Sequence, residues 1–196
     1  MKSLIEKIKS LIVLSEEAEA QVYKIAKTRN LAKGDILIRE GEKVNKSFFV
    51  LDGCIRSFSN NNTGREHTLQ FAIKDWWVSD FTALYNNSIA SLTVECIKEA
   101  KVIEFNTDDL NEIYHLFPEF ERYQRKNLER YAMNLNHRIL NQLQLSASDR
   151  YDLFLKQYAD IEQYISNYHI ASYLGITQQS LSRIRLEKTK KKESDS

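Results

Sequence analysis

Apolar residues recur every three or four positions at the start of the chain, which is the spacing of one helical face. The set comprises Leu4, Ile5, Ile8, Leu11 and Ile12. A second helix should begin after Ser15, because a serine hydroxyl can cap a first turn and Glu16 and Glu17 follow it. The pattern predicts that two short helices open the chain.

Short runs rich in β-branched and aromatic residues follow as far as Phe105. These runs are DILIRE, KSFFVLD, CIRSFS, EHTLQFAI, SLTVECI and KVIEF. The stretches LDGC and NNNTGRE are typical of hairpin turns. We expect roughly seven or eight strands in an antiparallel sandwich or roll.

Helical spacing returns after Phe105, where Thr107 with the acidic residues Asp108 and Asp109 predicts a helix cap. Pro118 suits the first turn of a long helix that continues to about residue 145. Such a helix would be roughly 42 Å long, more than one side of a compact domain of this size requires. Its apolar stripe is narrow, which favours pairing with a second helix. The alternative is a helix that lies across its own β domain.

Ser146 or Ser148 can cap a further helix, and the stretch IASYLGITQQSLSRIR predicts a helix-turn-helix. Gly175 allows the sharp turn and Thr177 caps the second helix. Burial should consume the apolar residues, namely Ile170, Ala171, Leu174, Ile176, Leu181 and Ile184. The side chains left facing outward are Gln178, Gln179, Ser182, Arg183 and Arg185. Glutamine can pair with adenine and arginine with guanine, so this face could read DNA, whereas the alternative is an ordinary helical corner.

The net charge of the chain is only +1, so its overall field does not favour a nucleic acid. Between residues 178 and 192, however, a single acidic residue, Glu187, accompanies a group of basic side chains. The group comprises Arg183, Arg185, Lys188, Lys190, Lys191 and Lys192. The local charge therefore supports a DNA partner, and the last residues, KTKKKESDS, are expected to be frayed.

Several classes of protein are disfavoured. Cys54 and Cys96 stand alone in apolar surroundings and are expected to be reduced core residues. The histidines, His67, His115, His137 and His169, are dispersed, so we expect no metal and no cofactor. No phosphate loop or nucleophile elbow occurs, so we expect no enzyme and no catalytic residue. No run approaches the ~18 apolar residues of a membrane span, which predicts a cytoplasmic protein without a membrane partner.

The stretches KGDILIREGE and LDGCIRSF, the long helix and the terminal IASYLGITQQSLSRIR together resemble the cyclic-AMP receptor protein/fumarate-nitrate reductase regulator (Crp/Fnr) family of bacterial transcription factors. The resemblance covers nearly the whole chain and implies an α+β fold. Residues 1–115 would form an antiparallel β-roll, the jelly roll that binds cyclic nucleotides, 116–146 a dimerisation helix and 147–196 a helix-turn-helix domain. It implies a homodimer that regulates transcription and binds double-stranded DNA at a palindromic site.

The resemblance also assigns roles to residues. Base contacts fall on Gln178, Gln179 and Arg183, of which only the arginine matches the usual family side chains. Phosphate contacts are assigned to Thr177, Ser180, Ser182, Arg185 and Lys188. The dimer helix would present Leu128, Tyr131, Leu135 and Ile139. The rival hypothesis is a β-roll that binds a ligand or a protein and has no DNA function; a steep salt dependence of duplex binding would distinguish DNA binding from it.

In members that bind cyclic nucleotides, a Gly-Glu pair and an Arg-Ser pair hold the phosphate. Here these positions fall on Ser79 with Asp80 and on Ala90 with Ser91, so only the serine is kept. A buried phosphodiester needs a permanent cation, and we expect no response to cyclic AMP.

Any small-molecule effector of the roll would lie at Asp80, Phe81, Ala90 and Ser91. Arg56 and Arg65 lie beside turns and are expected to face water. The aromatic side chains of this region are expected to fill the roll and to brace it on the long helix, with an apolar effector pocket as the alternative. They are Trp76, Trp77, Phe81 and Tyr85.

Overall fold

The computed structural model describes the backbone of residues 1–194 and the side chains of residues 1–190. Two helices open the chain as predicted, α1 (Lys2–Lys9) and α2 (Glu16–Ile25). The Ser15 hydroxyl accepts a hydrogen bond from the backbone N–H of Ala18 at 3.3 Å, which confirms the predicted cap. The apolar face of α1 is buried against the side chains of Phe49 and Phe105.

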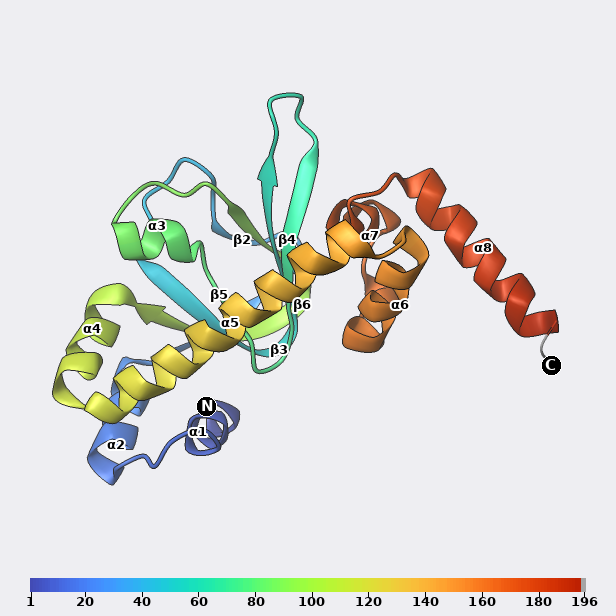
Figure 1. Cartoon of the computed structure of the whole chain (residues 1–196). Helices are drawn as coiled ribbons and strands as arrows, with labels where there is room; N and C mark the ends of the chain where they lie inside the picture. Colours follow the sequence, from blue (N-terminus) through green and yellow to red (C-terminus); the bar gives the residue numbers. More distant parts are fainter. Residues whose placement is uncertain (195–196) are drawn as a thin grey trace.

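The middle of the chain forms one antiparallel sheet that curls into a roll (Figure 1). Its strands are β1 (Lys27–Leu31), β2 (Ile36–Ile38), β3 (Lys46–Asn60), β4 (Glu66–Ala72), β5 (Trp77–Val78) and β6 (Thr93–Asn106). The main order is β1-β6-β3-β4, with β2 paired to β6 and β5 paired to β3. Strand β4 lies at one end of this order and so has a free edge.

The prediction of seven or eight strands was wrong, since the described sheet has six. The stretch LDGC is no hairpin: Asp52 and Gly53 lie within β3, where the pairing with β6 shifts its register. Likewise, SLTVECI and KVIEF belong to one strand, β6. Bulges bend these two long strands around the roll without ending them. The other predicted turn, NNNTGRE, does connect β3 to β4, with the N–H of Asn61 bonded to the carbonyl of Arg65 at 3.0 Å.

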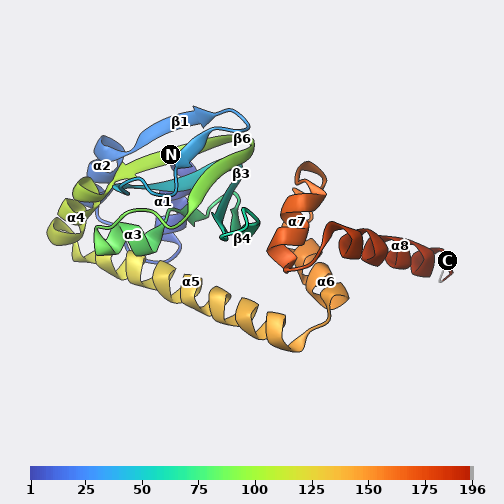
Figure 2. The ribbon, with the colours of Figure 1, turned by 90° about the horizontal axis from the view of Figure 1, so that it is seen from above.

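Three further helices cover the roll: α3 (Phe81–Asn86), α4 (Thr107–Leu116) and α5 (Pro118–Gln144). Thr107 is the first residue of α4 and not its cap, because Asn106 occupies the cap position. Helix α5 lies along the roll (Figures 1 and 2). Near its beginning, Tyr123 accepts a hydrogen bond from the Trp77 indole at 3.0 Å. One face of the long helix is thus fixed to its own β domain.

The C-terminal part contains α6 (Ala147–Tyr158), a 3-10 turn (Glu162–Tyr164), α7 (Asn167–Leu174) and α8 (Gln178–Ser194). Ser146, one of the two residues predicted to cap this helix, caps α6. The tail expected to be frayed from residue 188 is helical as far as Ser194, and the rest of that prediction falls on 195–196, outside the described residues.

The C-terminal part is docked against the roll by aromatic packing. The ring of Phe71, on β4, lies 6.1 Å from that of Phe154, 5.7 Å from that of Tyr158 and 5.3 Å from that of Tyr173. Phe71 is fully buried, and its three partners come from α6 and α7. This cluster sets where the helix-turn-helix sits relative to the sheet.

Candidate nucleic-acid interface and effector site

Helices α7 and α8 are joined by a short turn and pack around a small apolar core. Gly175 ends α7 with φ of +70°, a conformation that glycine adopts without strain. Leu181 and Ile184 of α8 are buried in one core with Ile170 and Leu174 of α7. Because these α8 residues are three positions apart, they occupy one side of the helix and leave the other side to solvent.

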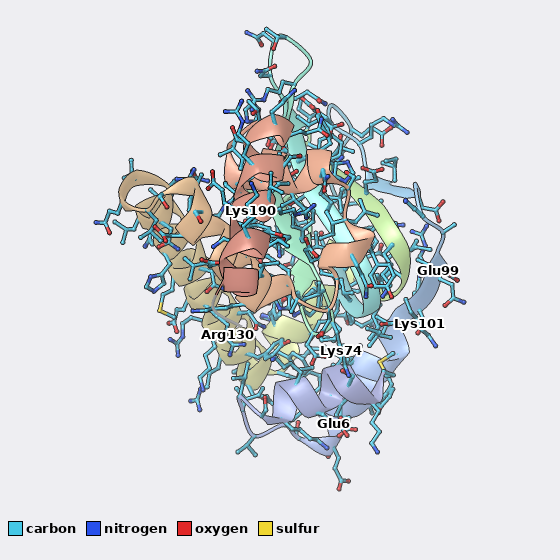
Figure 3. All side chains as sticks on the ribbon, turned by 90° about the vertical axis from the view of Figure 1, so that its right-hand side faces the viewer. Glu6, Lys74, Glu99, Lys101, Arg130 and Lys190 are labelled. Atoms are coloured by element: carbon cyan, nitrogen blue, oxygen red, sulfur yellow. The ribbon has the colours of Figure 1, made fainter. Side chains whose placement is uncertain are left out.

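The outer side of α8 carries the residues predicted to contact bases. Gln178, Gln179 and Arg183 are exposed, and so is Ser182. Within the described part of the chain, Arg183 makes no hydrogen bond or ion pair. Helix α8 projects away from the rest of the molecule (Figure 1), and Figure 3 shows Lys190 on it, toward the viewer. The predicted outward placement is therefore confirmed, whereas the contacts with bases stay a prediction.

The residues predicted to contact phosphates are placed differently from one another. The Thr177 hydroxyl caps α8, accepting from the N–H of Ser180 at 3.1 Å and lying 3.0 Å from the Ser180 hydroxyl. Both hydroxyls lie at the N-terminus of α8, where free N–H groups favour an anion. Ser182 is exposed on the same side as Arg183.

Arg185 and Lys188 are engaged within the protein and do not point freely into solvent. The Arg185 guanidinium donates to the Tyr151 hydroxyl at 2.9 Å and forms an ion pair with Glu162. The Lys188 ammonium lies 2.7 Å from the carboxylate of Asp152. These bonds tie α8 to α6 and to the 3-10 turn, so the two cations stabilise the domain. Sequence spacing did not reveal this, because the acidic partners lie more than twenty residues away.

Sequence analysis missed the residue that joins the three parts of the molecule. Arg138, on α5, donates to the Thr68 carbonyl on β4 at 2.8 Å and to the Tyr173 carbonyl on α7 at 3.0 Å. Its guanidinium also donates to the Leu69 carbonyl and lies 4.2 Å from the centre of the Tyr173 ring. No local signal distinguishes Arg138 from the other arginines of α5.

Ser172 of α7 completes the free edge of the sheet. Its hydroxyl accepts from the Thr68 N–H at 2.9 Å and donates to the Glu66 carbonyl at 2.8 Å. An edge strand exposes such groups, and here a side chain of the helix-turn-helix satisfies them. The orientation of α7 is therefore coupled to the position of β4.

The predicted effector residues of the roll are partly brought together. Asp80 is only 1% exposed, and its carboxylate accepts from the Ala83 N–H at 3.0 Å. It also accepts from the Ser91 N–H at 2.8 Å, the Ser91 hydroxyl at 3.0 Å and the Leu92 N–H at 3.1 Å. Ala90 is buried and its carbonyl accepts from the Gly41 N–H at 2.9 Å. The Asp80 carboxylate thus occupies these hydrogen-bond donors of the roll.

Phe81 points away from that cluster, toward the long helix. Its ring is 5.6 Å from that of Tyr131 on α5 and 6.1 Å from that of Tyr85. Tyr85 in turn accepts a hydrogen bond from the Gln124 amide at 2.7 Å. Together with the Trp77–Tyr123 bond, these contacts confirm that the aromatic segment braces the roll on α5.

The expectation that Arg56 faces water was wrong. Its side chain is 1% exposed and lies between the carboxylates of Glu66, at 2.6 Å, and Glu95, at 2.8 Å. Its guanidinium is also 3.9 Å from the centre of the Phe58 ring. Strand pairing places Arg56 of β3 between β4, which carries Glu66, and β6, which carries Glu95, so the arginine is shielded from water. Arg65 is exposed, as expected.

The apolar residues of α5 lie on two sides of the helix, and the part of the predicted residues in a dimer stays a prediction. Leu128, Tyr131 and Leu135 line a cavity on the side that faces the protein's own roll and C-terminal helices. The apolar residues exposed on α5 include Met133, Ile139, Leu140 and Leu143, the last of them 78% exposed. We call these four residues the α5 stripe. Of the predicted dimer residues, Ile139 belongs to it, and Leu128 is 37% exposed outside it.

The cavity has a volume of about 300 Å³ and lies where the roll, α5 and the C-terminal helices meet. Trp76, Trp77 and Phe81 line it from the roll, and Phe154 and Tyr173 from α6 and α7. Asp80, Ala90 and Ser91 are not among its lining residues. Of the four residues that the sequence assigned to an effector site, only Phe81 lines this cavity.

The two thiols are buried, as predicted. Burial raises the pKa of Cys54 to about 12 and that of Cys96 to about 11, so both remain protonated at neutral pH. Among the described residues, no group of three histidine, cysteine or acidic side chains is arranged to hold a metal ion. None of the described helices combines the length and apolar character needed to cross a membrane.

Comparison with known proteins agrees with this architecture. Residues 28–116 match the family model of the cyclic nucleotide-binding domain. The transcriptional activator protein FnrA of Stutzerimonas stutzeri is 23% identical over 173 residues, which cover 82% of this chain and 69% of that protein.

Solved structures share the fold of nearly the whole chain. FixK2 from Bradyrhizobium japonicum superposes with a TM-score of 0.70 at 20% identity, covering 85% of this chain and 86% of its own. A regulator of the Crp/Fnr family from Eubacterium rectale gives a TM-score of 0.73 at 18% identity, covering 90% and 85%. The order of roll, long helix and terminal helices is therefore common to these proteins.

Proposed function

We propose that the chain is a homodimeric transcription regulator of the Crp/Fnr family that binds double-stranded DNA sequence-specifically. The observation that carries this proposal is the outer face of α8, where Gln178, Gln179 and Arg183 are exposed while Leu181 and Ile184 fill the core. Long polar side chains on a projecting helix can enter a major groove and bond to base edges. We propose no catalytic role for the chain.

The proposed assignment divides the contacts by what each side chain is free to do. Gln178, Gln179 and Arg183 would read bases, and Thr177, Ser180 and Ser182 would bond to phosphates. Arg185 and Lys188 would hold α8 in place through Glu162 and Asp152. A two-fold dimer presents two copies of α8, so the site would be a palindrome with half-sites about one helical turn apart.

Selection of bound sequences from a random duplex pool tests the proposal directly. We expect a palindromic consensus, and affinity for it that falls steeply as salt rises, because phosphate contacts release counterions. A pool that yields no consensus, or equal affinity for all duplexes, would contradict sequence-specific binding.

Arg183→Ala should weaken binding to the selected duplex by about 1–3 kcal/mol and relax the preference at one base position. The reason is that an arginine that pairs with guanine contributes discrimination as well as affinity. The measurement is a titration of labelled selected and random duplexes. Arg122→Ala is the matched control, because Arg122 is exposed on α5, far from α8 in sequence and structure. If Arg183→Ala lost the same affinity for both duplexes, Arg183 would not contribute to base recognition.

We further propose that the roll does not respond to cyclic AMP. The donors near Asp80 already hold its carboxylate, so a phosphodiester would find no free N–H group there and would face a like charge. Arg56, the buried cation of the neighbouring strand, is paired with two glutamates. Calorimetric titration with millimolar cyclic AMP should give no binding heat and no change in DNA affinity. A saturable heat would overturn this part of the proposal.

A further inference from the structure

The hairpin that connects β3 to β4 belongs to the roll but projects on the side of α7 and α8 (Figure 1). One Nη of Arg65, in this hairpin, donates to the carbonyl of Ile176 at 3.5 Å. Ile176 directly precedes Thr177, whose hydroxyl caps α8. A cationic side chain of the roll therefore lies beside the start of the helix that carries the proposed base contacts.

The end of the hairpin is bonded to α7. The N–H of Glu66 donates to the Tyr168 hydroxyl at 3.4 Å. One turn further along α7, Ser172 bonds to the Glu66 carbonyl and to the Thr68 N–H, as described above. Helices α7 and α8 in turn share one apolar core. The hairpin and the two helices are thus connected, which keeps Arg65 beside α8.

The turn of the hairpin is held by its own hydrogen bonds. The Asn61 Oδ1 accepts from the Thr63 N–H at 3.0 Å, from the Thr63 hydroxyl at 2.7 Å and from the Arg65 N–H at 2.9 Å. The N–H of Gly64 donates to the Asn61 carbonyl at 2.9 Å. A loop that is ordered before binding loses little conformational entropy when it meets a partner. The turn therefore presents the Arg65 side chain from a preorganised backbone.

The guanidinium of Arg65 has donors to spare. Its side chain is exposed, and the 3.5 Å bond to the Ile176 carbonyl is longer than an ordinary N–H···O bond. Among the described residues, this guanidinium makes no other hydrogen bond and no ion pair. Its free donors form a planar fork, which matches the oxygens of a phosphate.

The carboxylates near the hairpin lie at its base. The Glu66 carboxylate is paired with the buried Arg56, and that of Glu40 lies 3.5 Å from the Asn60 amide. Residues 61–65 contain no acidic side chain. The tip therefore carries the single positive charge of Arg65, and the partner that such a charge favours beside α8 is the DNA backbone.

We propose that this hairpin is a second DNA-binding element, in which Arg65 bonds to a phosphate beside the one held at the start of α8. The contact is with the backbone, because Arg65 lies next to the first turn of α8, where free N–H groups favour a phosphate. It adds affinity without sequence preference. This inference rests on the proposed function, since it concerns the same DNA.

The test measures the affinity of the full chain for the selected palindrome, with about one helical turn of flanking sequence on each side. Arg65→Gln should weaken binding about tenfold and reduce the slope of log affinity against log salt by about 2, one for each protomer. Random duplexes should lose affinity by a similar factor, because a phosphate contact does not depend on sequence. Arg65→Lys should keep most of the affinity, since it retains the charge.

Arg122→Gln is the matched control, because Arg122 is also an exposed arginine but lies near the start of α5, away from the C-terminal helices (Figure 1). It should change neither the affinity nor the salt slope. Thermal unfolding of each variant checks that it is folded.

Duplexes with one neutral methylphosphonate linkage in each half-site locate the contact. At one position, loss of the charged oxygen should weaken binding of the unaltered protein but should not weaken Arg65→Gln further. The two changes would then remove the same contact, so their effects are not additive. If Arg65 acted only by holding the Ile176 carbonyl, no linkage would show this coupling.

Several results would overturn the inference. Arg65→Gln might match Arg122→Gln in affinity and slope, or no linkage might couple to Arg65. Tighter binding by Arg65→Gln would show that the hairpin obstructs DNA. If the unaltered protein selects no duplex, the proposed function is wrong. If it selects a palindrome and Arg183→Ala relaxes the base preference while Arg65→Gln has no effect, the inference alone is wrong.

Discussion

Leu140→Asp should convert the protein into a monomer and weaken its binding to the palindromic site by about 100-fold or more, because two linked half-sites bind far more tightly than one. Leu140 is 46% exposed in the middle of the α5 stripe, next to Ile139 and near Leu143. An isolated chain leaves these side chains in water, and pairing of two α5 helices would bury them. A buried carboxylate at the seam would have no partner.

Sedimentation measures the change in mass, and titration of the selected duplex measures the loss of affinity. Leu116→Asp is the matched control, because Leu116 is also an exposed leucine but lies at the end of α4. That variant should remain a dimer. If Leu140→Asp also remained a dimer, the α5 stripe would not be the interface. Leu135→Asp, the change that the sequence pattern favoured, would instead place a charge in the cavity of the same chain.

Gly53→Ala should destabilise the protein by about 3–5 kcal/mol, the sum of overpacking and left-handed backbone strain. A Cβ on Gly53 would lie 2.3 Å from the Glu99 carbonyl oxygen and 2.6 Å from the Ala100 Cβ. These atoms belong to the paired strand β6, so they cannot move without disturbing the sheet. The φ of Gly53 is +89°, which adds strain for any other residue.

Urea unfolding of the variant and of Gly34→Ala separates the two causes. Gly34 has φ of +94°, but a Cβ there would meet nothing within 4 Å. Its replacement should therefore cost only the backbone strain, about 1–2 kcal/mol. Equal losses at both positions would show that the close approach of β3 and β6 at Gly53 is not energetically important.

The helix boundaries of the C-terminal part were predictable because they depend on neighbouring residues. Ser146 and Thr177 cap helices through N–H groups three positions ahead, and Gly175 turns the chain between two helices. The same locality explains why the outward placement of Gln178 and Arg183 was predicted correctly. Sequence spacing assigns sides to a short helix once its buried residues are known.

The strand count was wrong for a physical reason that appears at Gly53. A glycine beside an aspartate is typical of a hairpin, yet here it lets β3 pass close to β6 within a register shift. The choice between a turn and a bulge depends on the partner strand, some forty-five residues later in the chain. The conformational preferences of neighbouring residues therefore cannot decide between a turn and a bulge here.

The sequence by itself determined the order of roll, long helix and helix-turn-helix, the caps of several helices and the residues left outside on α8, because periodicity and capping act over a few residues. Only the tertiary structure decided which arginines are free. Arg56 is enclosed by two glutamates, Arg138 joins three elements and Arg185 is paired with Glu162, while Arg183 stays exposed. These differences arise from contacts between residues far apart in the chain, and such contacts exist only after folding brings them together.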